Sequence, residues 1–160
     1  MSRLFLRLAL CSAALAVPAT AYADLTAFVG VNPTPSARPV RGFAGGISLL
    51  IVGFEFEYAH ASEDTSELAP GLRTYMGNAL LQTPFPIGGL QLYATAGGGI
   101  YRETLFDVTE TNVGANVGGG VKMSLLGPLR LRLDYRVFTL RGEARHPRAQ
   151  RFYAGLNLRF

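Results

Sequence analysis

A strict alternation of apolar and charged residues near the end of the chain constrains the fold more than any other feature. In "PLRLRLDYRVFTL" (128–140), leucine, tyrosine and valine take every second position, while three arginines and one aspartate take the positions between them. A period of two is that of a β-strand, which turns successive side chains to opposite faces. We expect a strand with one apolar and one charged face, and the fold depends on which face meets the surroundings.

Similar alternating segments recur along the chain, separated by Gly, Pro, Asn and acidic clusters that are typical of turns. The further expected strands span 25–31, 42–50, 52–61, 72–82, 90–103, 113–125 and 151–160. The total of eight predicts an all-β fold, an eight-stranded antiparallel up-and-down β-barrel that spans a membrane. The join at 48–52 has no turn residue, but one strand from Phe43 to Tyr58 would exceed the nine to eleven residues that usually cross a membrane.

The connections alternate in length, as expected for a chain that crosses a membrane up and down. Short ones are expected around Leu50, at "TPFPIGG" and at "LGP". Longer polar ones are expected at "NPTPSARP", "ASEDTSELAPG", "TLFDVTETN" and "RGEARHPRAQ". Outer-membrane barrels have short periplasmic turns and longer external loops.

The polar face of the strands has the composition of a narrow interior. It is rich in glycine, which makes room inside a barrel of eight strands, and Lys122 is the only lysine among many arginines. An arginine at the lipid midplane costs roughly 2–4 kcal/mol, so in a membrane barrel the arginines should point inward. The expected lumen charge network is Glu55, Glu57, Lys122, Arg130, Arg132, Asp134, Arg136 and Arg159. Its main alternative roles are an ionic plug and a narrow water path; a soluble lipocalin-like barrel would invert the two faces.

The first 23 residues are typical of a secretory signal peptide. Arg3 and Arg7 precede an apolar run, and "AYA" (21–23) fits a cleavage site, so the domains are expected to be 1–23 and 24–160. Cys11 lies within the segment and follows Leu10, which suits lipid acylation poorly. Removal of the two arginines leaves 13 basic and 11 acidic side chains. This near balance argues against nucleic acid as a partner.

The last strand ends on an aromatic residue and alternates apolar residues before it. This resembles the terminal strand of bacterial outer-membrane proteins, and the chain from 24 to 160 resembles the small OmpA/OmpX-like and opacity-protein-like outer-membrane β-barrels. The resemblance implies a cell outer membrane location in a Gram-negative envelope and an assembly signal read by the barrel-assembly machinery. The residues of that signal are Phe152, Leu156, Leu158 and Phe160.

Two loop segments carry candidate functional residues. "HASED" contains His60, Ser62, Glu63 and Asp64, while His146 lies in another loop; the four consecutive residues do not form the spatial order that a catalytic triad needs. In "RGEARHPRAQR", the arginines could contact lipopolysaccharide phosphates, because arginine suits phosphate recognition. Those arginines are Arg141, Arg145 and Arg148. Two well-separated histidines and no cysteine after cleavage predict no metal site, and no cofactor is expected.

The aromatic residues at strand ends suit the girdles of a membrane barrel. They are Tyr58, Tyr101, Phe138, Phe152 and Phe160. The sequence therefore predicts a non-enzymatic, monomeric barrel surrounded by outer-membrane lipid, with a structural or surface-interaction role. The alternatives are a narrow porin-like pore for ions or small solutes, a soluble periplasmic ligand-binding barrel, and a lipid-modifying enzyme.

Overall fold

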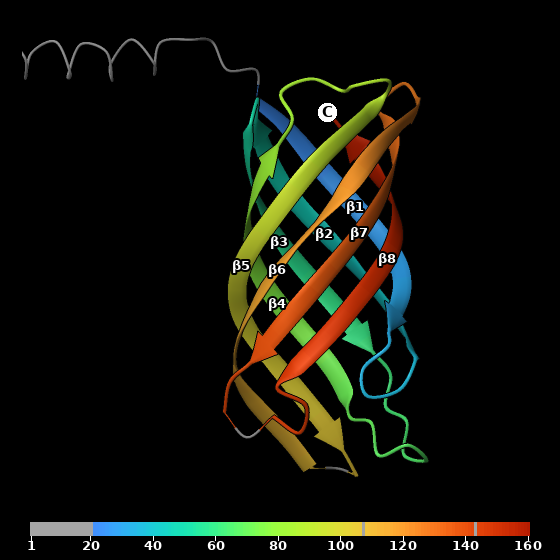
Figure 1. The fold of residues 1–160 in the computed structure, drawn as a ribbon, viewed down its shortest axis with the longest axis vertical. Coiled ribbons are helices and arrows are strands. Elements are labelled where there is room, and N and C mark those ends of the chain that lie inside the picture. The colour runs from blue at the N-terminus through green and yellow to red at the C-terminus, as the bar shows by residue number, and fades with distance from the viewer. Residues whose placement is uncertain (1–20, 107, 143) are drawn as a thin grey trace, which may run out of the picture.

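The protein is a closed antiparallel β-barrel of eight strands (Figure 1). The structure, a computed structural model, describes residues 21–160 apart from positions 107 and 143. The strands are β1 (Ala21–Asn32), β2 (Arg38–Leu49), β3 (Val52–Ala61), β4 (Gly71–Gln82), β5 (Leu90–Leu105), β6 (Val108–Leu126), β7 (Leu129–Leu140) and β8 (Arg148–Arg159). The expected fold class and strand number are confirmed. In the described part of the chain, no helix is long and apolar enough to span a membrane.

The first and last strands close the barrel. Their register runs from Asp24 opposite Arg159 to Val31 opposite Phe152. Ala23 and Phe160 exchange backbone hydrogen bonds of 2.8 and 3.0 Å beside this seam. The start of β1 and the C-terminus therefore lie at the same end, shown at the top of Figure 1.

The connections at this end are short. Leu50 and Ile51 alone separate β2 from β3, so the segment 48–52 contains a turn despite its lack of turn residues. Gly127 makes the turn between β6 and β7 with a φ of 55°, a conformation that suits glycine because it has no Cβ. The β4–β5 connection spans 83–89. In outer-membrane barrels the short turns lie on the periplasmic side, so this end is the one expected to face the periplasm.

The opposite end carries connections that are longer on the whole and span 33–37, 62–70 and 141–147, although the first is shorter than the 83–89 connection. The segment "TLFDVTETN" (104–112) is a correction to the expected loop. Most of it is strand, because β5 and β6 stay paired as far as Leu105 and Val108. The two strands therefore project beyond β7 and β8 as a long hairpin (Figure 1, lower end).

The apolar face of the strands points outward and the polar face points inward. Phe54 and Leu133 are 57% and 41% exposed on the outer wall, whereas Glu57 and Arg132 are fully buried inside. The lipocalin-like alternative needed the opposite arrangement, with leucines around a cavity, and is therefore wrong. In β4, Met76 points inward and Tyr75 outward.

Two expectations about individual side chains are corrected. Tyr101 and Phe138 are only 1% exposed and lie inside the barrel, so they do not belong to an outer aromatic girdle. Not every arginine of the strands points inward either: Arg41, Arg73 and Arg102 are exposed on the outer wall. All three lie near the end with the longer loops, where a charge on the outer wall costs little.

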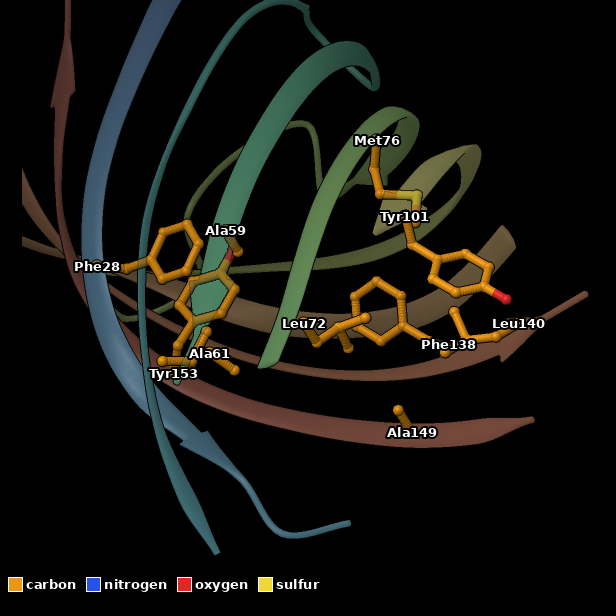
Figure 2. Close-up of a cluster of buried hydrophobic side chains, with 11 residues drawn as sticks. Phe28, Ala59, Ala61, Leu72, Met76, Tyr101, Phe138, Leu140, Ala149 and Tyr153 are labelled. Atoms are coloured by element: carbon orange, nitrogen blue, oxygen red, sulfur yellow. The ribbon is translucent and has the colours of Figure 1, made fainter. Parts of the chain in front are cut away.

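The buried apolar side chains fill the lumen toward the loop end (Figure 2). Phe28 stacks on Tyr153 with 4.0 Å between the ring centroids, and Phe138 and Leu140 lie across from Leu72 in the same cluster. We call this set the apolar cluster; its members are Phe28, Val40, Ala59, Ala61, Leu72, Met76, Tyr101, Phe138, Leu140, Ala149 and Tyr153.

The expected signal peptide falls mostly outside the described residues, which begin at Ala21. Ala21–Ala23, which cleavage before Asp24 would remove, pair with Ile47–Leu49 at the edge of β1. The cleavage site stays a prediction.

Candidate functional site

Charged side chains from opposite walls of the barrel meet in the middle of the lumen. Arg136 of β7 donates from Nη2 to Glu55 Oε1 of β3 over 3.0 Å and from Nε to Asp134 Oδ1 over 2.9 Å. Arg132 is hydrogen-bonded to both oxygens of Glu55 and lies 3.1 Å from Asp134. Strands β3 and β7 are not neighbours in the sheet. These ion pairs therefore cross the lumen and tie its walls together.

A third arginine extends the cluster toward the loop end. Arg151 of β8 donates from Nη1 to Glu57 Oε1 over 2.9 Å and from Nη2 to Thr74 Oγ1 over 3.1 Å. Its guanidinium lies 4.4 Å from the ring centroid of Phe138, where a cation–π contact is favourable. We call the six charged residues the ionic cluster; its members are Glu55, Glu57, Arg132, Asp134, Arg136 and Arg151.

Two tyrosines surround the carboxylate of Asp134. The hydroxyl of Tyr93 is hydrogen-bonded to Asp134 and accepts a bond of 2.7 Å from Arg132 Nε, and the hydroxyl of Tyr153 donates to Asp134 over 3.1 Å. The Arg132 guanidinium also lies 4.8 Å from the ring centroid of Tyr93. These contacts satisfy the carboxylate of Asp134, as a buried ion requires, whereas Nη1 of Arg136 is buried without a hydrogen-bond partner.

Glycines on the inner face leave the space that these side chains occupy. A Cβ at Gly118 would lie 2.9 Å from Cγ of Arg136, and a Cβ at Gly120 would lie 2.5 Å from the hydroxyl of Tyr93. Both distances are shorter than real Cβ contacts. The glycine-rich polar face thus has the steric role that the sequence indicated.

A separate polar group lies toward the periplasmic end. Lys122 Nζ lies 2.9 Å from Asp24 Oδ2, which also accepts a hydrogen bond of 3.1 Å from Ser48. Arg130 donates over 2.9 Å to Gln91 and is in no ion pair among the described residues. Arg159 packs over the ring of Tyr22, 3.3 Å from its centroid.

The expected lumen charge network is therefore brought together only in part. Six of its members are buried on the inner wall in ion pairs: Glu55, Glu57, Lys122, Arg132, Asp134 and Arg136. Arg130 and Arg159, although expected in this network, form no ion pair with a carboxylate among the described residues. The expected network did not include Asp24, which directly follows the expected cleavage site, or Arg151, which begins the expected strand 151–160.

The residues of "HASED" lie at the loop end of the barrel, and their side chains make separate hydrogen bonds. Asp64 accepts hydrogen bonds from the hydroxyl and the backbone of Ser66 over 2.5 and 3.1 Å. Those bonds lower the pKa of the Asp64 carboxyl below its ordinary value. Glu63 instead accepts a bond of 2.9 Å from the backbone of Phe106. In the described part of the chain, no hydrogen bond links His60 or His146 to Ser62, Glu63 or Asp64, so the geometry holds no triad.

The expected lipopolysaccharide contacts lie on and beside the β7–β8 connection. Arg141, Arg145 and Arg148 are all exposed, and the backbone of Arg145 donates to Glu103 over 3.3 Å. The expected assembly-signal residues share the outer face of β8 and its end, where all four are exposed: Phe152, Leu156, Leu158 and Phe160. Among the described residues, no group of three or more His, Cys, Asp or Glu could hold a metal ion.

Comparison with known proteins identifies a family for this chain. A family model described as "Outer membrane protein beta-barrel domain" matches residues 8–160. No curated protein matches the chain in sequence.

Solved structures show the same fold at low sequence identity. Neisserial surface protein A (NspA) is 16% identical, with a TM-score of 0.70, over 88% of this chain and 97% of that one. The N-terminal β-barrel domain of Pseudomonas aeruginosa OprF is also 16% identical, with a TM-score of 0.67, over 87% and 97% of the two chains. The outer membrane enzyme PagL is 10% identical, with a TM-score of 0.52, over 84% and 98%.

Proposed function

The chain belongs to the outer membrane protein β-barrel domain family. We propose that it is a non-conducting structural barrel of the outer membrane, and that its external loops make surface contacts. Membership of this family indicates a β-barrel of the outer membrane, but a shared fold does not specify an activity. The role is argued from the lumen and the loops of this chain.

The observation that carries the proposal is the filling of the lumen. The guanidinium-bearing residues Arg132, Arg136 and Arg151 are all 0% exposed and bridge opposite walls in the middle of the barrel. Toward the loop end, the apolar cluster continues the filling (Figure 2). The space between Arg38, Leu72 and neighbouring residues measures only about 10 Å³, about the room of one water molecule. Two successive layers therefore close the path through the barrel.

Conductance in planar lipid bilayers tests this part of the proposal. The purified, folded barrel should give no discrete channel events across a range of voltages and salt concentrations. Insertion is checked in the same bilayers by protection of the strands from added protease. Discrete, reproducible channels from the wild-type protein would overturn the closed lumen and support the pore alternative instead.

The external loops are the proposed contact surface. The long β5–β6 hairpin projects beyond the other strands (Figure 1), and Phe106 and Val108 at its tip are 58% and 66% exposed. Cells that display the wild-type barrel should settle out of suspension faster than cells that display a barrel with residues 104–109 replaced by a short turn. Equal settling, at equal surface levels of folded protein, would contradict a surface-interaction role for the hairpin.

An enzymatic role lacks a supporting observation in this chain. PagL shares the fold, yet His60 and His146 lie apart from the other candidate residues and form no relay with them. We therefore expect no hydrolysis of acyl chains from phospholipid or lipid A by the purified barrel. Hydrolysis that disappears in His60→Ala or His146→Ala would establish a lipid-modifying enzyme and overturn this expectation.

We also propose that the chain is exported with residues 1–23 as a cleaved signal peptide, and that the mature barrel acts as a monomer. The mature chain would then begin at Asp24, whose side chain pairs with Lys122 inside the barrel. The intact mass of the protein from the membrane fraction tests the cleavage, and an uncleaved mass would refute it.

A further inference from the structure

Four basic side chains lie side by side on the outer wall of the barrel near the loop end. They come from four consecutive strands: Arg41 from β2, His60 from β3, Arg73 from β4 and Arg102 from β5. Each lies directly opposite the next in the strand register. Directly opposed residues of an antiparallel sheet share a face, with Cβ atoms roughly 4.5–5.5 Å apart. We call these four residues the basic row.

The basic row has no acidic partner in the described part of the chain. The ion pairs among described residues all lie inside the barrel. Arg102 Nε has only the hydroxyl of Thr111 within reach, at 3.3 Å. Like charges directly opposite one another destabilise a sheet. An anion bound across the row would remove this repulsion.

An aromatic row marks the depth of these four residues in the membrane. Phe43, Tyr58 and Tyr75 lie two residues closer to the middle of the same strands, and they too are directly opposed. Their ring centroids are 5.3 Å apart for Phe43 and Tyr58 and 5.1 Å apart for Tyr58 and Tyr75. Aromatic girdles of this kind lie at the membrane–water interface. The basic row therefore lies at the level of the lipid headgroups, on the side of the external loops.

An open groove continues from the basic row along the apolar wall. It has a volume of about 620 Å³ and contains Arg41 and His60 at its loop end, beside Phe43. Farther along the wall it is lined by Ala27 and Leu156, which are directly opposed on β1 and β8. A groove with the guanidinium of Arg41 at one end and an apolar floor is complementary to an anionic headgroup with an acyl chain.

We propose that the basic row and this groove form a binding site for a phosphate-bearing lipid of the outer leaflet. The phosphate lies against the guanidinium groups, which suit it because arginine offers several donors in a planar fork. An acyl chain of the same lipid lies along the groove between Phe43 and Leu156. The site lies on a different part of the rim from Arg141, Arg145 and Arg148, and it is independent of any contact made by the loop tips.

The test compares lipid binding by three matched proteins. Wild-type barrel, the row variant Arg41→Gln/Arg73→Gln/Arg102→Gln and the loop variant Arg141→Gln/Arg145→Gln/Arg148→Gln are purified in a neutral detergent. Each is titrated with bisphosphorylated lipid A, with its dephosphorylated form and with inorganic phosphate, and binding is read by native mass spectrometry. The two variants lose the same number of charges, so only the position of the charges differs. A heat-shift gel verifies that each protein is folded.

The wild type should retain lipid A, and the row variant should bind it at least roughly tenfold more weakly, as expected for losing one or more charge-assisted contacts. The dephosphorylated lipid should bind poorly, which excludes binding through the acyl chains alone. The loop variant should lose much less affinity than the row variant, because its arginines are expected to contact lipopolysaccharide from the loop and do not line the groove. Equal binding by the wild type and the row variant, or an equal loss in the loop variant, would overturn the site. Preference for inorganic phosphate over lipid A would overturn the lipid assignment. If the triple row variant fails to fold, Arg73→Gln alone is compared with Arg148→Gln.

Discussion

The carboxylate of Glu55 on β3 lies 3.0 Å from the guanidinium of Arg136 on β7, across the lumen from it. Since β3 and β7 are separated by three strands on one side of the ring, only closure of the barrel brings these side chains together. The pair is fully enclosed and shares its charges with Arg132 and Asp134. Its integrity is therefore a direct measure of how strongly the ionic cluster stabilises the fold.

Glu55→Ala should destabilise the barrel by about 3–5 kcal/mol, because it leaves two buried guanidinium groups without one of their carboxylates. Guanidinium-induced unfolding of the barrel in lipid vesicles, followed by circular dichroism, measures the free energy of unfolding. Glu67→Ala, in the exposed β3–β4 connection, removes the same charge and should change it little. Similar values for the two variants would show that the ionic cluster adds no stability.

Gly120→Ala should destabilise the barrel by about 1–3 kcal/mol, the usual cost of overpacking. The new methyl group would lie 2.1 Å from the backbone oxygen of Leu133 and 2.5 Å from the hydroxyl of Tyr93, which Arg132 and Asp134 hold in place. Gly77→Ala is the matched control, since the nearest atom to its Cβ is 3.9 Å away. The denaturant midpoints of unfolding of the two variants test this difference in packing. A lowered midpoint for Gly77→Ala alone would contradict the close packing around Gly120.

Leu133→Arg should cost about 2–4 kcal/mol, because the residue lies midway along β7 on the lipid-facing wall. Leu126→Arg, beside the β6–β7 turn, should cost only about 0–1 kcal/mol, since charges near the membrane interface are tolerated. Unfolding in vesicles gives both values. An equal cost at the two positions would be inconsistent with a membrane centred on the apolar wall.

The carboxyl of Asp64 should titrate with a pKa below its ordinary value, because the hydroxyl and backbone of Ser66 donate to its charged form. A lowered pKa in the folded state means that the charged carboxylate stabilises the turn above the ordinary pKa. This contribution is lost as the pH falls through the lowered pKa. Side-chain NMR titration measures it, and Ser66→Ala should return the pKa toward the ordinary value. No change in Ser66→Ala would show that the serine hydroxyl is not the cause.

Removal of the ring in Phe160→Ala should lower the amount of folded barrel in the outer membrane and leave unfolded chain in the periplasm, if the end of β8 is the assembly signal. Phe106→Ala, at the tip of the β5–β6 hairpin, removes an exposed ring from the opposite end (58% exposed, against 68% for Phe160) and serves as the control. Heat-shift gels of fractionated cells separate folded from unfolded chain. Unchanged levels of folded Phe160→Ala would exclude an essential role for this residue in assembly.

The local pattern of the sequence was sufficient for the number of strands and, in most of them, for the separation of an apolar from a polar face. In β7, Leu133 lies on one face and Arg132 and Asp134 lie on the other, because side chains alternate strictly along a strand. In a membrane barrel the apolar face must meet the lipid, so the charged face points inward. The pattern does not predict the structure where the alternation is irregular or where a turn lacks typical turn residues. In β4, alternation is unclear between Leu80 and Leu81, and the turn at Leu50–Ile51 has no turn residue.

Only the closed barrel decides which inward charges meet. Arg130 and Arg132 occupy equivalent inward positions on β7, yet Arg132 reaches Glu55 while Arg130 reaches Gln91. The difference arises from the tilt and register of strands far apart in the sequence, which set the height of each side chain in the lumen. The same register aligns Arg41, His60, Arg73 and Arg102 on the outer wall. Alternation determines the face of each residue, whereas the tertiary structure determines its neighbours.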